Sequence, residues 1–179
     1  MLSTLISSKT RLKLLLKFFL NSQSSAYLRN LETEFGASTN AIRLELNKFE
    51  QAGLLESHMQ GNKKLFQANT KHPLFGDIHN ILIKHFGFDT IIETVTENIG
   101  NLQKVFLTGA FAKGMDSDII DIICVGENIN KEYLLKMVDK AEKLIKHKIR
   151  YMLMKAEEFV EYRKKIKDGE LLLLWEKEE

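Results

Sequence analysis

The chain has 179 residues, of which 44% are apolar, 28% are charged and only one is proline, so it is not an intrinsically disordered protein and can form one large or two small domains. Its longest apolar run, Leu171 to Trp175, is far shorter than the roughly 20 residues that cross a bilayer, so no membrane span is expected. Basic residues interrupt the N-terminal apolar segment, and a single cysteine, Cys124, cannot form an intramolecular disulfide. We therefore expect a cytoplasmic protein.

The net charge of +2 is unevenly distributed along the chain. Residues 1–72 carry ten Lys or Arg against five Asp or Glu, a net charge of +5, whereas residues 73–179 carry sixteen against nineteen, a net charge of −3. A positive domain attracts polyanions such as DNA by displacing condensed counterions, although the same excess can serve solubility alone. The first 72 residues are therefore the candidate DNA-binding part.

Residues 10–20 have the apolar spacing of a helix. One face of this helix consists of Leu12, Leu15, Leu16 and Phe19. Leu14 and Phe18 form a second apolar stripe on nearly the opposite side, which one small core would not need. The second stripe predicts either a further contact, with the other domain or with a second chain, or a helix buried on both sides within its own chain.

A second helix is predicted to begin after Ser24 or Ser25, either of which can cap it, and to end at Gly36. Its inward-facing residues are expected to be Tyr27, Leu28, Leu31 and Phe35.

A third helix is predicted to begin after Ser38 and to end at Ala52-Gly53, with Ile42, Leu46 and Phe49 on its buried side. At about 100° per residue, its other side collects two amides, a guanidinium and an aliphatic side chain, from Asn40, Arg43, Leu44 and Asn47. Arg pairs with guanine, Asn pairs with adenine, and an aliphatic group contacts the thymine methyl. This side therefore predicts base reading; the alternative is an ordinary polar face with Leu44 in a dimer contact.

Residues 54–58 and 64–68 flank the turn Gln60-Gly61-Asn62 and predict a β-hairpin, whose tip carries Lys63 and Lys64. A hairpin directly after a recognition helix can place such lysines on DNA phosphates. Three helices and a hairpin, joined by the segment NKFEQAGLL at 47–55, resemble the winged helix-turn-helix of ArsR- and MarR-like bacterial regulators over about residues 8–72. The resemblance implies DNA binding, although some members of this superfamily bind protein. The paired cysteines of ArsR metal sensors are absent from the sequence, so metal sensing is not implied.

Pro73 predicts a boundary, after which residues 74–86 have the apolar spacing of a connecting helix that ends at Gly87. His72, His79 and His85 are seven and six residues apart, unlike the three to five of local zinc ligand pairs. We therefore expect structural histidines and no metal site.

A helix over 88–99 and a buried strand over 105–107 are predicted to precede the segment GAFAKGMDSDIIDIICVG at 109–126. This segment resembles the signature of the minimal nucleotidyltransferase, or polymerase-β-like, fold over about residues 88–160. The resemblance implies a strand ending in Gly-Ser, a second glycine before Ser-Asp-x-Asp, and a third carboxylate from a later strand. Together these groups hold the metal ions that clamp nucleotide phosphates.

The sequence departs from that signature at each chemical group. Asp118 and Asp121 are three residues apart, which places them on opposite faces of a regular strand unless a bulge intervenes. Asp116 and Asp118 have the spacing of two residues that the chemistry needs, but they lie before the strand. Gly109-Ala110 lacks the hydroxyl, and the later strand has Arg150 or Tyr151 where the third carboxylate is expected. We therefore expect no catalysis and no cofactor. If the domain is active, Asp116, Asp118 and Asp121 are its catalytic residues and Mg²⁺ its metal.

A remnant anion site is a further prediction, with Thr108, Gly109, Lys113 and Gly114 as its residues. The remaining segments predict a helix capped by Asn130, a strand over 149–154 and a helix over 156–167. The apolar segment Leu171 to Trp175 must dock on this sheet or on a partner chain.

The sequence thus predicts an α+β protein, with a winged helix-turn-helix over residues 1–72, a connecting helix over 73–87 and a small α/β nucleotidyltransferase-like domain over 88–179. The expected function is a homodimeric transcriptional regulator that binds double-stranded DNA in a sequence-specific manner and uses the second domain for dimerisation or sensing. Leu14, Phe18 and the C-terminal leucines are the candidate dimer surface. The alternatives are an active nucleotidyltransferase, acting on a protein or small molecule, and a protein-binding module.

Overall fold

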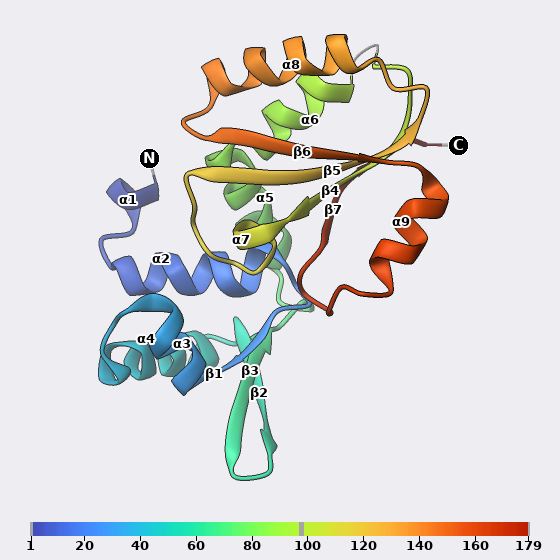
Figure 1. Cartoon of the computed structure of the whole chain (residues 1–179). Coiled ribbons are helices and arrows are strands. Elements are labelled where there is room, and N and C mark those ends of the chain that lie inside the picture. The colour runs from blue at the N-terminus through green and yellow to red at the C-terminus, as the bar shows by residue number, and fades with distance from the viewer. Residues whose placement is uncertain (1, 97–98, 179) are drawn as a thin grey trace. The chain divides into compact units, whose positions relative to one another are not determined.

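The computed structural model describes residues 2–96 and 99–178 and divides the chain into two compact units, Met1–His85 and Phe86–Glu179 (Figure 1). The division falls near the end of the predicted connecting helix, observed as α5 (Phe75–Phe86). None of the described helices combines the length and the apolar character needed to cross a membrane.

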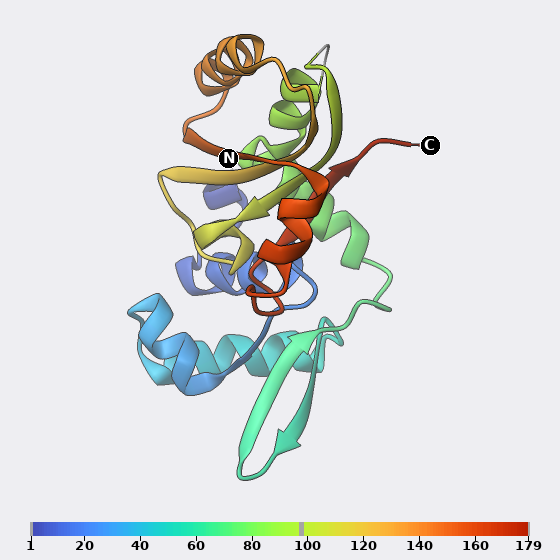
Figure 2. The ribbon, with the colours of Figure 1, turned by 45° about the vertical axis from the view of Figure 1, so that its right-hand side comes forward.

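The first unit is a winged helix. Before α5 it contains α1 (Leu2–Leu5), α2 (Lys9–Leu15), a π-helical turn (Leu16–Leu20), β1 (Ser25–Tyr27), α3 (Leu28–Phe35), α4 (Thr39–Gln51), β2 (Leu55–Gln60) and β3 (Lys63–Ala68). The strands form an antiparallel sheet in the order β1-β3-β2. Figure 2 shows the β2–β3 hairpin, the wing, projecting beyond α3 and α4.

Local chemistry defines the two helices at the centre of this unit. The Ser38 hydroxyl accepts a hydrogen bond from the Ala41 amide at 3.2 Å and caps α4, as predicted. Gly36, with φ of 59°, ends α3 in the left-handed conformation that favours glycine. Ile42, Leu46 and Phe49 are buried, which confirms the predicted inner side of α4.

Two predictions for this unit are wrong. Residues 25–27 form β1 instead of the first turn of a helix, because they pair with β3, where Ala26 lies opposite Phe66. Leu14 and Phe18 are fully buried in the chain and therefore offer no dimer surface. Their burial excludes a contact of this second apolar stripe with a second chain.

The second unit is a small α/β layer. Its elements are α6 (Phe88–Thr96), β4 (Asn101–Thr108), α7 (Gly109–Ala112), β5 (Ile119–Glu127), α8 (Lys131–Leu144), β6 (Lys148–Met154), α9 (Ala156–Arg163) and β7 (Leu172–Glu176). The sheet order is β6-β5-β4-β7, in which β5 and β6 are parallel and the other pairs antiparallel. Residues 97–98 of the predicted helix over 88–99 lie outside the described residues. The C-terminal leucines dock on this sheet as β7.

Register brings one apolar side chain from each strand into a row, namely Leu173, Phe106, Ile123 and Met152. Helix α9 covers the middle of this face, where the Phe159 ring stacks on Phe106 with centroids 4.4 Å apart. Asn130 caps α8 through the Tyr133 amide, as predicted, and α8 buries Leu134, Val138 and Ala141. Helices α6 and α8 pack together on the other side of the sheet (Figure 1).

Candidate nucleic-acid interface

The outer face of α4 is open to solvent. It consists of the four residues singled out by helical spacing, Asn40, Arg43, Leu44 and Asn47, all of them exposed. Leu44 is 52% exposed. The structure therefore brings two amides, a guanidinium and an aliphatic group together on one accessible surface, here called the α4 face.

A partly buried ion pair holds α4 against α2. The Arg11 guanidinium donates two hydrogen bonds to Glu45, from Nε to Oε2 at 2.9 Å and from Nη2 to Oε1 at 3.2 Å. The hydrogen bond from Arg11 is the main reason that the pKa of Glu45 lies below its ordinary value; Lys48, at 3.3 Å, lowers it further. Glu45 lies on the buried side of α4, so this pairing fixes which side of the helix faces outward.

Glu50, at the end of α4, ties the wing to this helix. Its carboxylate accepts hydrogen bonds from the Ser57 hydroxyl on β2 and from the Lys64 ammonium on β3, the latter at 2.7 Å. Lys64 and then Ser57 lower the pKa of Glu50. Lys64, expected to hold a DNA phosphate, is thus already paired with a carboxylate of its own unit.

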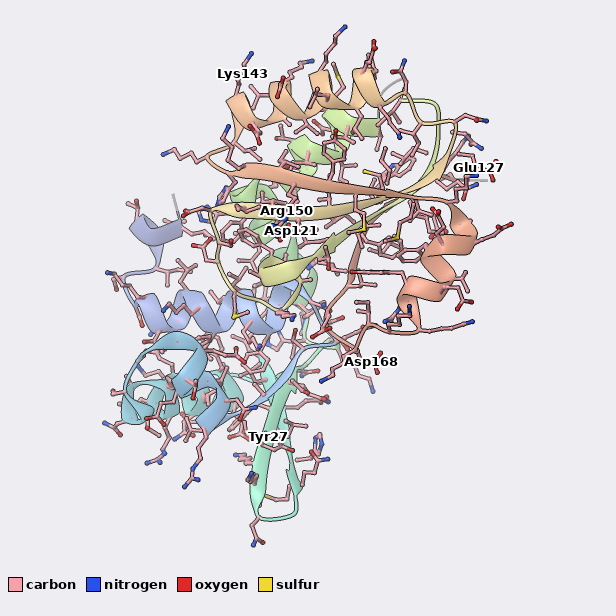
Figure 3. All side chains as sticks on the ribbon, in the orientation of Figure 1. Tyr27, Asp121, Glu127, Lys143, Arg150 and Asp168 are labelled. Atoms are coloured by element: carbon pink, nitrogen blue, oxygen red, sulfur yellow. The ribbon has the colours of Figure 1, made fainter. Side chains whose placement is uncertain are left out.

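Lys63 has a different environment. Its ammonium lies over the ring of Tyr27, 5.7 Å from the centroid, and the Tyr27 hydroxyl bonds to Gln60 at the end of β2. Figure 3 shows Tyr27 on the side of the wing where β1 runs into α3. An aromatic ring under an ammonium favours one position of a long, flexible side chain.

A hollow of about 510 Å³ lies beside the α4 face. Its wall is formed by Tyr27, Leu28, Arg29, Asn30, Arg43, Asn47, Asn62, Lys63, Lys64 and Phe66. Asn62 lies in the predicted hairpin turn but was not named as a site residue. Sequence reasoning also missed Tyr27, Arg29 and Asn30, because only the pairing of β1 with β3 brings the start of α3 next to the wing. No spacing rule within one helix or hairpin could have found them.

The basic residues of this unit divide into engaged and uncompensated ones. Lys13 donates to the Phe35 carbonyl at 2.7 Å, and Lys17 pairs with Glu34 at 2.8 Å. Within residues 2–96 and 99–178, Arg29, Arg43 and Lys63 form no ion pair. Three of the cations of this unit without an ion pair, Arg29, Arg43 and Lys63, therefore line the hollow.

In the second unit, one of the three aspartates named as catalytic if the domain is active already has a cationic partner. Asp121 pairs with Arg150, which lies beside it on the parallel strand β6 (Figure 3). Asp116 is 67% exposed, with its nearest basic contact His147 at 3.9 Å, and the main-chain carbonyl of Asp118 accepts from the Lys148 amide. The part of the chain that the structure describes contains no cluster of three His, Cys, Asp or Glu suited to a metal ion.

Residues predicted to form the anion site also contact carboxylates of their own unit. Thr108 lies opposite Asp121 in the β4–β5 ladder, and Gly109 sits directly against the Asp121 carboxylate. Lys113 pairs with Glu170 at 3.1 Å, and this contact is the main cause of the lowered pKa of Glu170. Gly114 follows in the turn after α7, a helix of only four residues.

Neither a protein-family model nor a curated protein matches the chain in sequence. Solved structures similar to it include the homodimeric winged helix-turn-helix DNA-binding domain of a candidate ArsR-family regulator from Mycobacterium bovis, at 18% identity over 44% of this chain and 72% of that one, with a TM-score of 0.35. Reduced HlyU from Vibrio cholerae matches at 14% identity over 48% of this chain and 84% of that chain, with a TM-score of 0.38. A nucleotidyltransferase candidate from Sulfolobus solfataricus matches at 24% identity over 54% of this chain and 83% of that chain, with a TM-score of 0.37.

Proposed function

We propose that the protein is a cytoplasmic transcriptional regulator that binds double-stranded DNA and reads its sequence with the α4 face. The observation that carries this proposal is the exposure of Asn40, Arg43, Leu44 and Asn47 on a helix whose other side is core, next to a wing. Asn and Arg side chains match the hydrogen-bonding edges of adenine and guanine, and Leu44 can contact a thymine methyl. Lys63 contacts phosphate.

The second unit, in this proposal, serves dimerisation or sensing and not catalysis. Support comes from the pairing of Asp121 with Arg150 and of Lys113 with Glu170, because each pairing engages a group that nucleotide or metal would need. A homodimer would read two half-sites, which increases both the base contacts and the effective concentration of each winged helix.

Selection from a pool of random duplexes, followed by affinity measurements over a salt series, tests the DNA-binding proposal. We expect a recurrent sequence in the selected duplexes and a linear fall of log affinity with log salt concentration, because bound phosphates release counterions. A protein with no salt-sensitive affinity for any duplex would instead support the protein-binding alternative. Sedimentation of the selected complex then measures whether two chains occupy one site.

A further inference from the structure

We propose that the hollow beside the α4 face holds one sugar-phosphate unit of a DNA strand, with Arg29 of α3 and Lys63 of the wing as its phosphate ligands. This inference rests on the proposed DNA binding. It adds a contact that comes from neither the α4 face nor the hairpin alone, and it assigns a role to Arg29.

The shape of the hollow suits a backbone unit. Its volume of about 510 Å³ is enclosed by three elements: the start of α3, the outer side of α4 and the wing. Tyr27, Leu28 and Phe66 provide apolar surface, while basic and amide side chains supply the rest of the wall. A deoxyribose presents an apolar face next to a charged phosphate, so a nucleotide unit matches both kinds of surface.

The charge of the hollow favours an anionic occupant. No Asp or Glu is among its lining residues, whereas Arg29, Arg43, Lys63 and Lys64 are. Lys64 is neutralised by Glu50, and the other three form no ion pair within the described residues. Three cations without counter-charges repel one another across the hollow, and a phosphate between them removes that repulsion.

The two ligands proposed for the phosphate are held in different ways. The ammonium of Lys63 is held over the Tyr27 ring, so little side-chain entropy is lost when an anion binds there. Arg29 projects from the first turn of α3 and can donate two hydrogen bonds to one phosphate. Asn30 and Asn62 supply further amide donors on either side.

Arg29→Gln and Lys63→Gln test this assignment, with Lys71→Gln as the matched control, since Lys71 is an exposed cation of the same unit outside the hollow. On the selected duplex and on random DNA, each hollow variant should weaken binding by a similar factor of roughly ten and reduce the salt slope by about one. The control should change neither quantity. Thermal unfolding of each variant verifies that the fold is retained.

A second measurement identifies the phosphate. Duplexes that carry a single neutral methylphosphonate should reveal one position per half-site where neutralisation weakens the wild-type protein by a larger factor than the Arg29→Gln variant, which keeps only the Lys63 contact. If Arg29→Gln behaves like Lys71→Gln while Arg43→Gln still loses affinity, the hollow is not a backbone site and DNA binding by α4 stands. Tight binding of a free nucleoside monophosphate that duplex DNA does not displace would overturn the inference. A wild-type protein without duplex binding would overturn both proposals.

Discussion

In the second unit, Nε of Arg150 lies 2.5 Å from a carboxylate oxygen of Asp121, its direct neighbour on the parallel strand. The Asp121 side chain is largely buried, and the pairing raises the pKa of the guanidinium, so the charge on Arg150 is permanent. The sequence has Arg150 or Tyr151 where the nucleotidyltransferase signature has its third carboxylate. In the structure, Arg150 pairs with Asp121, one of the carboxylates that would have to bind a metal ion in an active enzyme.

We therefore expect no nucleotidyl transfer. Incubation with each labelled nucleoside triphosphate and Mg²⁺ or Mn²⁺ should release no pyrophosphate and label no protein. The reason is that the Arg150 guanidinium already pairs with Asp121, a carboxylate that the metal ions would need. The Asp118→Asn/Asp121→Asn variant should be indistinguishable from wild type. Turnover by the wild type that this variant loses would establish the enzyme alternative.

Gly109→Ala should destabilise the second unit by about 2 kcal/mol or more. Gly109 has φ of 67°, and an added Cβ would overlap the Asp121 carboxylate. Urea unfolding followed by the fluorescence of Trp175, on β7 of the same unit, measures the loss. Gly36→Ala is the control for backbone strain alone, since φ is 59° but no atom lies within 4 Å of the added methyl, and it should cost about 1 kcal/mol in the first unit. Equal costs at both positions would argue against the close contact with Asp121.

Glu45→Gln should reduce the stability of the first unit by about 1 kcal/mol at neutral pH, a modest value because Arg11 is partly exposed and solvent screens the pair. The pKa of Glu45 is lowered in the folded chain, so its contribution is complete above the ordinary glutamate pKa and is lost as pH falls through the lowered one. The difference between wild type and variant should therefore shrink below about pH 4.5. Thermal unfolding as a function of pH measures it, with the exposed Glu32→Gln as control. A difference that grows on acidification would contradict the assigned ion pair.

Glu50→Gln should increase the salt dependence of DNA binding. The substitution leaves Lys64 without its carboxylate partner, so the ammonium becomes available to a phosphate and the slope against log salt should steepen by about one. Lys64→Gln in the wild-type background should have little effect for the same reason. A slope that flattens in Glu50→Gln, or a large loss in Lys64→Gln, would show that Lys64 already binds DNA.

Helical spacing and capping residues were sufficient to predict α4, its buried side and its exposed face, because these depend on neighbours within one turn. The hairpin and α8 could also be predicted from local signals, namely the turn cluster at 60–62 and the capping residue Asn130. The C-terminal leucines were expected to dock on the sheet or on a partner, and only the pairing of β7 with β4 decides between the two.

Features that depend on distant pairing were not predictable. Residues 25–27 resemble a helix start but pair with β3, and that pairing brings Arg29 to the hollow. The partners of Lys64 and Lys113 are likewise side chains from other elements, Glu50 and Glu170, so counting charges along the sequence overestimated what is available to a ligand. The burial of Leu14 and Phe18 also emerges only from the packed chain.

The most direct test of the central claim compares the affinity of wild type and Arg43→Ala for the selected duplex and for random DNA, at one salt concentration. If the α4 face reads bases, Arg43→Ala should lose roughly ten- to a hundredfold on the selected duplex, about 1–3 kcal/mol, and far less on random DNA, so that the ratio of the two affinities falls. An equal loss on both duplexes would show that Arg43 contributes charge alone and would contradict sequence reading by α4.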